Sequence, residues 1–367
     1  MNLPYSEELD IGHFSRLFDN KSECYKLFWF QAIVNKIEEG KDIFTYEELI
    51  DEMIADAWYM VTEYHLNLGP KDNLECVVHR ILEISQIRSG EKKERILSYL
   101  KECDDKEVKG YKRILTLNVP YRLQSPFMES MKGNEWKLSP RNLAARINQE
   151  KRLMYYFLDF NGQNTKIKME KEWAEYIRKN SEIIRGWIEL NMITYLQRRN
   201  PSVPGIVDKL YPPKERKLDK VKKYWKLVIS TKEFHEIYGN HLLESKNISI
   251  DHFIPWSYVA HDEFWNLHPT TKNINSSKSN HLPKWDKYFP LLGKMEYASY
   301  EMMWEYPMIH EEFEKCAAEH LNDQEIKRRL YQEDLSKEQF ISRLHEVVYP
   351  VYQSAQNAGF SQWYWEK

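Results

Sequence analysis

Several features that would mark special classes of protein are scarce or missing in this chain of 367 residues. The four cysteines stand far apart with no CxxC pair, which argues against a disulfide framework and against a zinc ribbon. No apolar run approaches the length of a membrane span, and the first ten residues are acidic where a signal peptide would be basic. Neither an internal repeat nor a low-complexity tract is visible. We therefore expect a cytoplasmic protein without membrane contacts.

The composition is that of a folded protein with a sizeable core. Hydrophobic residues make up 42 % of the chain and aromatic residues 14 %, enough to offset the conformational entropy lost on folding. The length predicts two or three domains. The formal net charge is only -3, which argues against a protein that coats nucleic acid non-specifically. Any nucleic-acid site must therefore be local.

Apolar residues recur at helical spacing over most of residues 1–195. The clearest helix start is Thr45, because Glu48 follows three residues later and completes a capping-box pattern. The apolar stripes indicate helices that pack against one another rather than a cofactor site. The predicted helices cover residues 25–37, 46–64 and 91–102, with one or two more within residues 170–195.

A composition break follows at Arg198. Residues 198–226 hold ten lysines and arginines against three acidic residues, a local charge of +7. Four prolines exclude a continuous helix from the first half of this basic stretch. In the second half an apolar stripe faces inward and leaves the lysines on the outer face.

The next segment has the order strand, loop, strand, helix. Residues 248–252 alternate in polarity, and Pro255 stops regular pairing after His252. A second strand is predicted around residues 264–268, and a helix begins after Thr270 or Thr271 as its cap. This is the compact order ββα.

Polar residues stand at informative offsets within this ββα segment. The histidine at 252 follows an aspartate, and two asparagines lie 14 and 23 residues after it. This pattern resembles the HNH, or ββα-metal, endonuclease family, in particular the Asp-His…Asn…Asn subgroup found in the HNH domain of Cas9-type nucleases. The flanking sequences are similar to those of bacterial HNH proteins with a helical N-terminal region. The positions that carry the resemblance are Asp251, His252, Pro255, Asn266, Asn275 and Lys278.

The residue types suit phosphodiester hydrolysis. His252 is the candidate general base, because a histidine is neutral and basic near neutral pH. Asp251 and the amide oxygen of Asn275 form a sparse oxygen set suited to Mg²⁺, with Mn²⁺ as a substitute; the lack of nearby cysteine makes zinc the weaker choice. Asn266, the second candidate catalytic residue, is expected to hold the loop after His252 through side-chain to backbone hydrogen bonds, the role that the resemblance implies. Lys278 lies on the same helical face as Asn275, where its ammonium could contact a phosphate.

Further basic residues are candidates for the nucleic-acid backbone. Lysines and arginines beside a metal site attract phosphates without reading sequence. His268, two residues after Asn266, either lines the site or is a buried structural histidine. Asp262 and Glu263 are expected to stay solvated in a hairpin loop. The candidate phosphate contacts from the basic stretch are Arg198, Arg199, Lys222, Lys223 and Lys226.

The predicted fold class is mainly α, with a small ββα-metal (HNH) motif embedded in the C-terminal half. We predict a helical N-terminal domain over residues 1–195, a basic connector with the nuclease core over residues 196–290, and a C-terminal helical region over residues 291–367. The last region contains a second capping-box pattern, Ser336 with Gln339. It is expected to pack on the core, because a ββα unit of about 40 residues buries too little surface to fold alone.

The resemblance implies a metal-dependent endonuclease that cleaves DNA and leaves 5′-phosphate and 3′-hydroxyl ends. By analogy, it implies a role in bacterial anti-phage defence or restriction, with the helical N-terminal half sensing a trigger, binding a protein partner or pairing with a second copy. Two alternatives stay open. One is an RNA-cleaving nuclease or toxin, because the motif binds a phosphate and does not read the 2′-hydroxyl. The other is a catalytically silent nucleic-acid-binding assembly protein.

Overall fold

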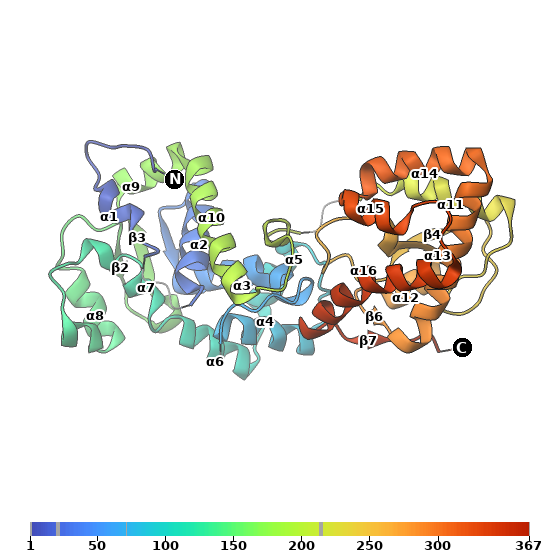
Figure 1. Cartoon of the computed structure of the whole chain (residues 1–367). Helices are drawn as coiled ribbons and strands as arrows, with labels where there is room; N and C mark the ends of the chain where they lie inside the picture. The colour runs from blue at the N-terminus through green and yellow to red at the C-terminus, as the bar shows by residue number, and fades with distance from the viewer. Residues whose placement is uncertain (1, 20–22, 71, 213–215, 367) are drawn as a thin grey trace. The chain divides into compact units, whose positions relative to one another are not determined.

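Helices predominate in the computed structural model, which describes residues 2–19, 23–70, 72–212 and 216–366 (Figure 1). The chain divides into two compact units. Unit 1 comprises Met1–Pro201 and Lys209–Pro212, and unit 2 comprises Ser202–Asp208 and Pro213–Lys367. The ββα motif lies in unit 2, in the C-terminal half of the chain, which confirms the predicted fold class. No described helix combines the length and the apolar character that crossing a membrane requires.

Unit 1 consists of helices and a small antiparallel sheet with strand order β1-β3-β2. This sheet was not predicted from the sequence, because its strands are only three or four residues long and their alternation of polar and apolar residues is too brief to stand out. Phe44 and Phe157 both pair with Ile167, so three buried apolar side chains meet across the sheet. The elements are α1 (Ile11–Ser15), α2 (Tyr25–Glu38), β1 (Ile43–Thr45), α3 (Tyr46–Thr62), α4 (Asn73–Ile84), α5 (Lys93–Glu102), α6 (Lys106–Leu115), α7 (Val119–Arg122), α8 (Pro140–Ile147), β2 (Tyr155–Leu158), β3 (Lys166–Met169), α9 (Lys171–Lys179) and α10 (Ser181–Arg199).

Helix α3 forms the centre of unit 1 and is buried along most of its length. The structure confirms its predicted start, because the Thr45 side chain accepts a hydrogen bond from the Glu48 N–H and the Glu48 carboxylate accepts one from the Thr45 N–H. Met53 and Trp58 of this helix are fully buried. The burial of each side chain contributes about 2 kcal/mol to the stability of the fold.

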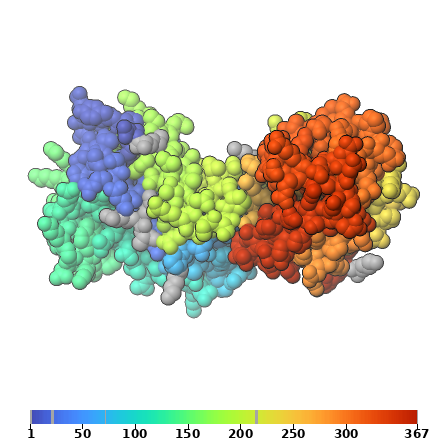
Figure 2. Space-filling view, in the orientation of Figure 1, coloured from blue at the N-terminus to red at the C-terminus, as the bar shows by residue number. Residues whose placement is uncertain are grey.

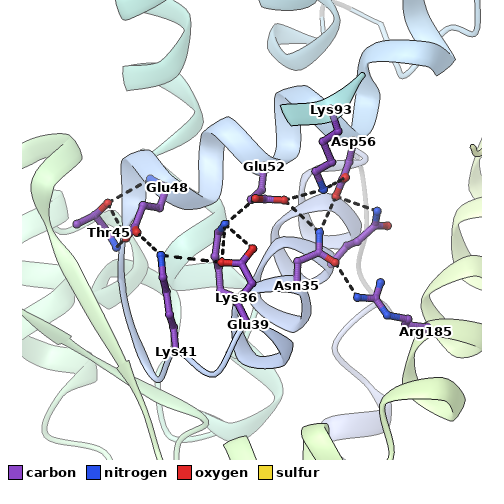
Figure 3. Close-up of polar contacts among 11 residues, drawn as sticks. Asn35, Lys36, Glu39, Lys41, Thr45, Glu48, Glu52, Asp56, Lys93 and Arg185 are labelled. Carbon is purple, nitrogen blue, oxygen red and sulfur yellow. Dashed lines mark hydrogen bonds and ion pairs between the residues drawn. The ribbon is translucent and has the colours of Figure 1, made fainter. Parts of the chain in front are cut away.

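A network of charged groups links α2, α3 and α5 (Figure 3). The Glu52 carboxylate, 2 % exposed, lies 2.6 Å from the Lys36 ammonium and 2.7 Å from that of Lys93. Lys93 also contacts Asp56 at 2.5 Å. Arg185 of α10 pairs with Glu38 at the edge of the same network. Each charged group of this network has an opposite partner, which the buried Glu52 in particular requires.

Unit 2 holds the two-stranded antiparallel sheet β4-β5 and the helices that surround it. On the face of unit 2 seen in Figure 2, the C-terminal helices, coloured orange to red, cover most of the surface. The elements are α11 (Asp219–Thr231), β4 (Ser249–His252), β5 (Leu267–Thr270), α12 (Lys272–Lys278), β6 (Leu282–Pro283), α13 (Trp285–Glu305), α14 (Pro307–His320), α15 (Gln324–Leu330), α16 (Lys337–Asn357) and β7 (Gln362–Trp363).

The second strand of the motif begins later than predicted. Residues 264–266 form a turn of 3₁₀ helix, and β5 starts at Leu267. The aromatic side chain of Phe264, at the predicted start of the strand, packs edge-on against Tyr224 of α11. Trp225 of α11 donates an indole hydrogen bond to the Leu267 carbonyl at 3.1 Å. Packing on α11 therefore sets where the strand begins.

The C-terminal helices pack in the same unit as the ββα motif. The predicted capping box at the start of α16 is present, because Ser336 and Gln339 exchange side-chain to backbone hydrogen bonds. The Tyr352 hydroxyl of α16 donates to the Pro283 carbonyl in β6 at 2.9 Å. This contact ties α16 to the segment that follows α12.

Candidate active site

Strands β4 and β5 set the register of the site. Asp251 pairs with His268 across the sheet, and His252 pairs with Leu267 at the last position of β4. Regular pairing ends there, and the chain turns at Pro255. In a regular strand the side chains of Asp251 and His252 would point to opposite faces of the sheet. Because β4 ends at His252, the His252 side chain need not follow this alternation.

Asn266 holds the loop that follows His252. Its side-chain oxygen accepts the Ile254 N–H at 2.7 Å, and its side-chain N–H₂ donates to the Ile254 carbonyl at 2.9 Å. The Asn266 carbonyl also accepts the Phe253 N–H. The expected side-chain to backbone hydrogen bonds are thus present, and the fully buried Asn266 has the contacts of a positioning residue.

The Asp251 carboxylate lies beneath the surface, surrounded by groups that favour its charged form. The Tyr238 hydroxyl donates to Oδ2 at 2.9 Å, and the Lys278 ammonium lies 3.2 Å from Oδ1. Tyr238 is held in turn by Glu236, whose carboxylate accepts the Tyr238 backbone N–H. Asp251 is 4 % exposed, so these partners stabilise a charge that burial alone would disfavour.

Lys278 is not placed as a phosphate contact. Its side chain is fully buried and donates to the His252 carbonyl at 2.6 Å in addition to its ion pair with Asp251. Burial lowers the pKa of its ammonium, although the Asp251 charge opposes that shift. Lys278 does lie one helical turn after Asn275, as the spacing predicts, but that face of α12 packs on β4 instead of facing solvent.

Asn275 reaches the same strand from α12. Its side-chain nitrogen donates to the Ser249 hydroxyl at 2.7 Å and to the Ile250 carbonyl at 3.0 Å. Because the Ile250 carbonyl can only accept a hydrogen bond, the atom of the Asn275 side chain that faces it must be the amide nitrogen, and the amide oxygen points away from that carbonyl. In the part of the chain that the structure describes, that oxygen has no hydrogen-bond partner. Asn275 therefore offers one oxygen ligand beside the residue that precedes Asp251.

The His252 imidazole contacts two charged groups. Its Nε2 lies 2.7 Å from Oδ1 of Asp262 and 2.8 Å from Nη1 of Arg216, and Arg216 also pairs with Asp262. Burial lowers the pKa of His252 below its ordinary value, and the Arg216 charge acts in the same direction, while Asp262 opposes both. The net effect favours the neutral imidazole, the form that can accept a proton.

Sequence reasoning missed Asp262 and Arg216. Asp262 was expected to stay solvated, yet it contacts His252, and the His320 imidazole of α14 contacts its carbonyl oxygen at 2.8 Å. Burial by itself raises the pKa of Asp262, but its hydrogen bond with His252 and the positive charge of Arg216 bring it below its ordinary value. Arg216 was recognised only as one charge in the basic stretch. No local spacing marks either residue, because Arg216 and Asp262 approach His252 from 36 and 10 residues away.

His268 is completely buried beside Asp251. Its Nε2 lies 3.7 Å from Oδ2 of Asp251, and among the described residues neither ring nitrogen has a hydrogen-bond partner. Burial lowers the pKa of His268 to about 4. The ring packs edge-on against Tyr238 and Phe253. His268 therefore lies within the site as a neutral side chain.

The basic stretch is divided between the two units. Arg198 and Arg199 end α10 and belong to unit 1, whereas Asp251 belongs to unit 2. Lys222 and Lys226 of α11 are exposed, but Lys223 pairs with Glu312 of α14 at 2.9 Å. The neighbouring acidic residues thus offset part of the charge that the sequence concentrates here. Lys214 of this stretch lies outside the described residues.

A family model described as HNH endonuclease matches residues 235–284. Residues 235–284 form an HNH endonuclease domain. The match spans β4, β5 and α12 and contains all the residues that surround Asp251, but Arg216 lies outside it. Comparison with curated proteins and with solved structures gives no match. This match supports a nuclease function and, with it, binding to nucleic acid.

HNH nucleases depend on a metal ion, and the donor atoms of this HNH domain suit one. Within the described ranges, no three side chains of His, Cys, Asp or Glu are grouped as a metal site would need. Asp251 offers a carboxylate, whose oxygens contact Tyr238 and Lys278 here, and Asn275 offers a carboxamide oxygen; the His268 imidazole lies 3.7 Å from Asp251. So few protein ligands suit a hard divalent cation that keeps several waters and takes phosphate oxygens.

Proposed function

We propose that this protein is a metal-dependent DNA endonuclease whose reaction takes place at the end of β4. The observation that supports the proposal is that Asp251 and His252 end β4 within the HNH domain, that Asn275 of α12 contacts the same strand at Ser249 and Ile250, and that the surroundings of His252 favour its neutral form. Phosphodiester hydrolysis needs a base for water and relief of charge on the phosphoryl oxygens.

The roles of the residues follow from their contacts. Asp251 and Asn275 would hold Mg²⁺, or Mn²⁺ in its place. A divalent cation bound there lowers the charge on the phosphoryl oxygens and on the leaving oxygen. His252 accepts a proton from the attacking water, and Asn266 keeps the loop behind His252 in place. Attack on phosphorus with departure of the 3′ oxygen leaves 5′-phosphate and 3′-hydroxyl ends. A single site cuts one strand, so the first product on a plasmid is a nick.

A plasmid nicking assay tests this proposal. The wild type is expected to convert supercoiled plasmid to the open circle with Mg²⁺ or Mn²⁺ and to leave it intact with EDTA. His252→Ala and Asn275→Ala are expected to lose activity by on the order of 10²-fold or more. His261→Ala is the matched control, because His261 is an exposed histidine in the same loop. Equal cleavage by His252→Ala and the wild type would refute the assigned base.

DNA is proposed as the substrate by analogy with the HNH family resemblance, and the same assay format tests RNA. A panel of duplex DNA, single-stranded DNA and RNA of matched sequence is expected to show cleavage of DNA. Preferred cleavage of RNA would replace the DNA assignment and keep the nuclease. The absence of metal-dependent cleavage on every substrate would favour a silent binding protein.

The biological role is proposed from the resemblance to bacterial HNH proteins with a helical N-terminal region. We propose that the protein acts in the cytoplasm in defence against phage or in restriction, and that unit 1 binds a trigger, a protein partner or a second copy. Plating efficiency of phage on cells that express the wild type or His252→Ala tests this role. Protection that is lost in the variant is the expected result.

A further inference from the structure

One carboxylate contacts both the histidine and the arginine of the site. Oδ1 of Asp262 lies 2.7 Å from Nε2 of His252 and also accepts from Nη1 of Arg216. Asp262 is itself fixed, because the His320 imidazole contacts its backbone carbonyl at 2.8 Å. The carboxylate thus occupies a set position between the two side chains.

The contacts of Nε2 bear on which nitrogen of His252 carries the hydrogen. Nε2 lies 2.7 Å from Oδ1 of Asp262 and 2.8 Å from Nη1 of Arg216, and Nη1 also donates to the same carboxylate oxygen. A lone pair on Nε2 would face the negatively charged oxygen, so the arrangement favours an N–H on Nε2 that donates to Asp262. In the neutral imidazole the other nitrogen, Nδ1, then keeps its lone pair. Within the described ranges no hydrogen bond to Nδ1 is found. The nitrogen that accepts a proton from water is therefore Nδ1.

Arg216 is the member of the basic stretch that the structure brings to His252. Its guanidinium lies 4.2 Å above the ring of Trp256 and its side chain is 27 % exposed. Lys278, the candidate from the sequence, is fully buried on Asp251. A guanidinium is planar, stays charged, and matches the geometry of a phosphate better than an ammonium does. Stacking on Trp256 and the contact with Asp262 hold it at the side of His252.

We propose that Asp262 is a positioning residue that orients His252 with Nδ1 toward the attacking water, and that it holds Arg216 where the guanidinium binds the scissile phosphodiester. This inference rests on the proposed nuclease function and assigns the phosphate contact to Arg216 in place of Lys278. The Asp262 carboxylate contacts both side chains, so it positions the proposed base, His252, and the proposed phosphate ligand, Arg216, together.

The first test replaces Asp262 by its isostere. Asp262→Asn is expected to lower kcat by about 10²- to 10³-fold and to change KM by less than about threefold, because the tautomer is no longer fixed. Asp262→Glu is expected to recover part of kcat. The matched control, Glu263→Gln, removes a neighbouring charge that does not contact His252 and is expected to keep wild-type kinetics.

A spectroscopic measurement separates positioning from mere stability. In protein labelled with ¹⁵N-histidine, the His252 resonances, assigned by comparison with His252→Ala, are expected to show hydrogen on Nε2 in the wild type. A mixture of tautomers is expected in Asp262→Asn. Hydrogen on Nδ1 in the wild type, or a kcat of Asp262→Asn within about threefold of wild type, would overturn the role of Asp262.

The second test measures the phosphate contact without cleavage. Binding of a DNA duplex in EDTA is expected to weaken in Arg216→Ala, and the slope of log K against log salt is expected to fall by about one. Arg216→Lys is expected to keep the slope, because it keeps the charge, but to recover only part of kcat/KM. Affinity and slope equal to wild type in Arg216→Ala, with the same melting temperature, would assign the phosphate contact elsewhere.

The two proposals fail in different ways. If the wild type cleaves no substrate with any metal, the nuclease function fails, while the tautomer and the DNA-binding measurements still decide the contacts of Asp262 and Arg216. If His252→Ala is inactive but Asp262→Asn and Arg216→Ala behave as wild type, the nuclease function holds and the inference is wrong.

Discussion

The buried ion pair between Asp251 and Lys278 is the most consequential residue-scale feature of the HNH domain. Asp251 is 4 % exposed and Lys278 is fully enclosed. Two charges in such surroundings are tolerated because each is the other's partner, and the cost of separating them is the desolvation of whichever charge remains. Lys278 thus compensates the charge of the buried Asp251 carboxylate.

Removal of this ammonium is expected to destabilise unit 2. Lys278→Met leaves the Asp251 carboxylate with the Tyr238 hydroxyl as its remaining side-chain hydrogen-bond donor among the described residues and is expected to lower the free energy of unfolding by about 3 to 5 kcal/mol. Urea unfolding followed by fluorescence measures this change. Lys284→Met, at an exposed lysine nearby, serves as control and is expected to stay within about 0.5 kcal/mol of wild type. Equal stability of the two variants would contradict the support assigned to Lys278.

Asn266 gives a graded test of the loop behind His252. Asn266→Ala leaves both the N–H and the carbonyl of Ile254 without their partner, and the expected loss of stability is about 2 to 4 kcal/mol. Asn266→Asp keeps the acceptor for the N–H but places a buried carboxylate oxygen against the Ile254 carbonyl, so its loss of stability is expected to be at least as large. The same order is expected for kcat in the nicking assay. Destabilisation without any loss of kcat would separate the loop from the reaction.

At the scale of elements, the helices around the HNH domain contribute more than a scaffold. Acidic residues of α14 lie against the lysines of α11: Glu312 pairs with Lys223, and Glu319 pairs with Lys220. A basic helix face is therefore partly neutralised by its neighbour. This is why a local charge of +7 in the sequence does not translate into an equally basic surface.

Helix α13 carries a buried acid whose effect depends on pH. Glu296 is 3 % exposed, and its Oε1 has no hydrogen-bond partner among the described residues. Burial raises the pKa of this carboxyl well above its ordinary value of 4.5. Between pH 4.5 and the raised value, the folded protein binds a proton that the unfolded chain has released. Stability is therefore fully present below about pH 4.5 and falls as pH rises through the folded pKa.

The corresponding variant is Glu296→Gln, a neutral isostere. Its free energy of unfolding relative to wild type is expected to increase with pH between pH 5 and pH 8, by at most about 1.4 kcal/mol per pH unit. Urea unfolding of both proteins at pH 5, 6.5 and 8 measures the difference. A difference that does not change with pH would mean that Glu296 is ionised in the folded protein throughout this range.

On the scale of the whole molecule, two compact units predict unfolding in more than one step. Cap variants assign the steps: Thr45→Ala weakens α3 of unit 1, and Ser336→Ala weakens α16 of unit 2, each by about 1 kcal/mol. Calorimetry is expected to show that each variant shifts a different transition. A single transition shifted equally by both variants would show that the units unfold together.

Metal binding is expected to act on unit 2 alone. Mn²⁺ at about 100 times its dissociation constant is expected to stabilise the transition assigned by Ser336→Ala by about 2.7 kcal/mol. Asn275→Ala is expected to abolish this shift, because it removes one of the proposed oxygen ligands. A shift that persists in Asn275→Ala would place the cation on other groups.

The sequence by itself determined what depends on neighbours along the chain. Capping boxes at Thr45 and Ser336 set helix starts because their partners lie three residues away. The ββα order and the resemblance to HNH nucleases could be inferred because Asp251, His252 and Asn275 lie close together in the sequence. The tertiary structure decided which way a face points: Lys278 shares a helix face with Asn275, but packing on β4 buries that face.

Contacts across long separations were likewise left to the tertiary structure. Strand β1 pairs with β3, more than 120 residues later, and Arg216 meets His252 across 36 residues. Asp262 looked like a loop acid, and only the fold of α14 and the basic stretch around it makes it a partner of the imidazole. Spacing predicts local geometry because a helix or strand repeats, whereas a distant contact exists only once the whole unit has packed.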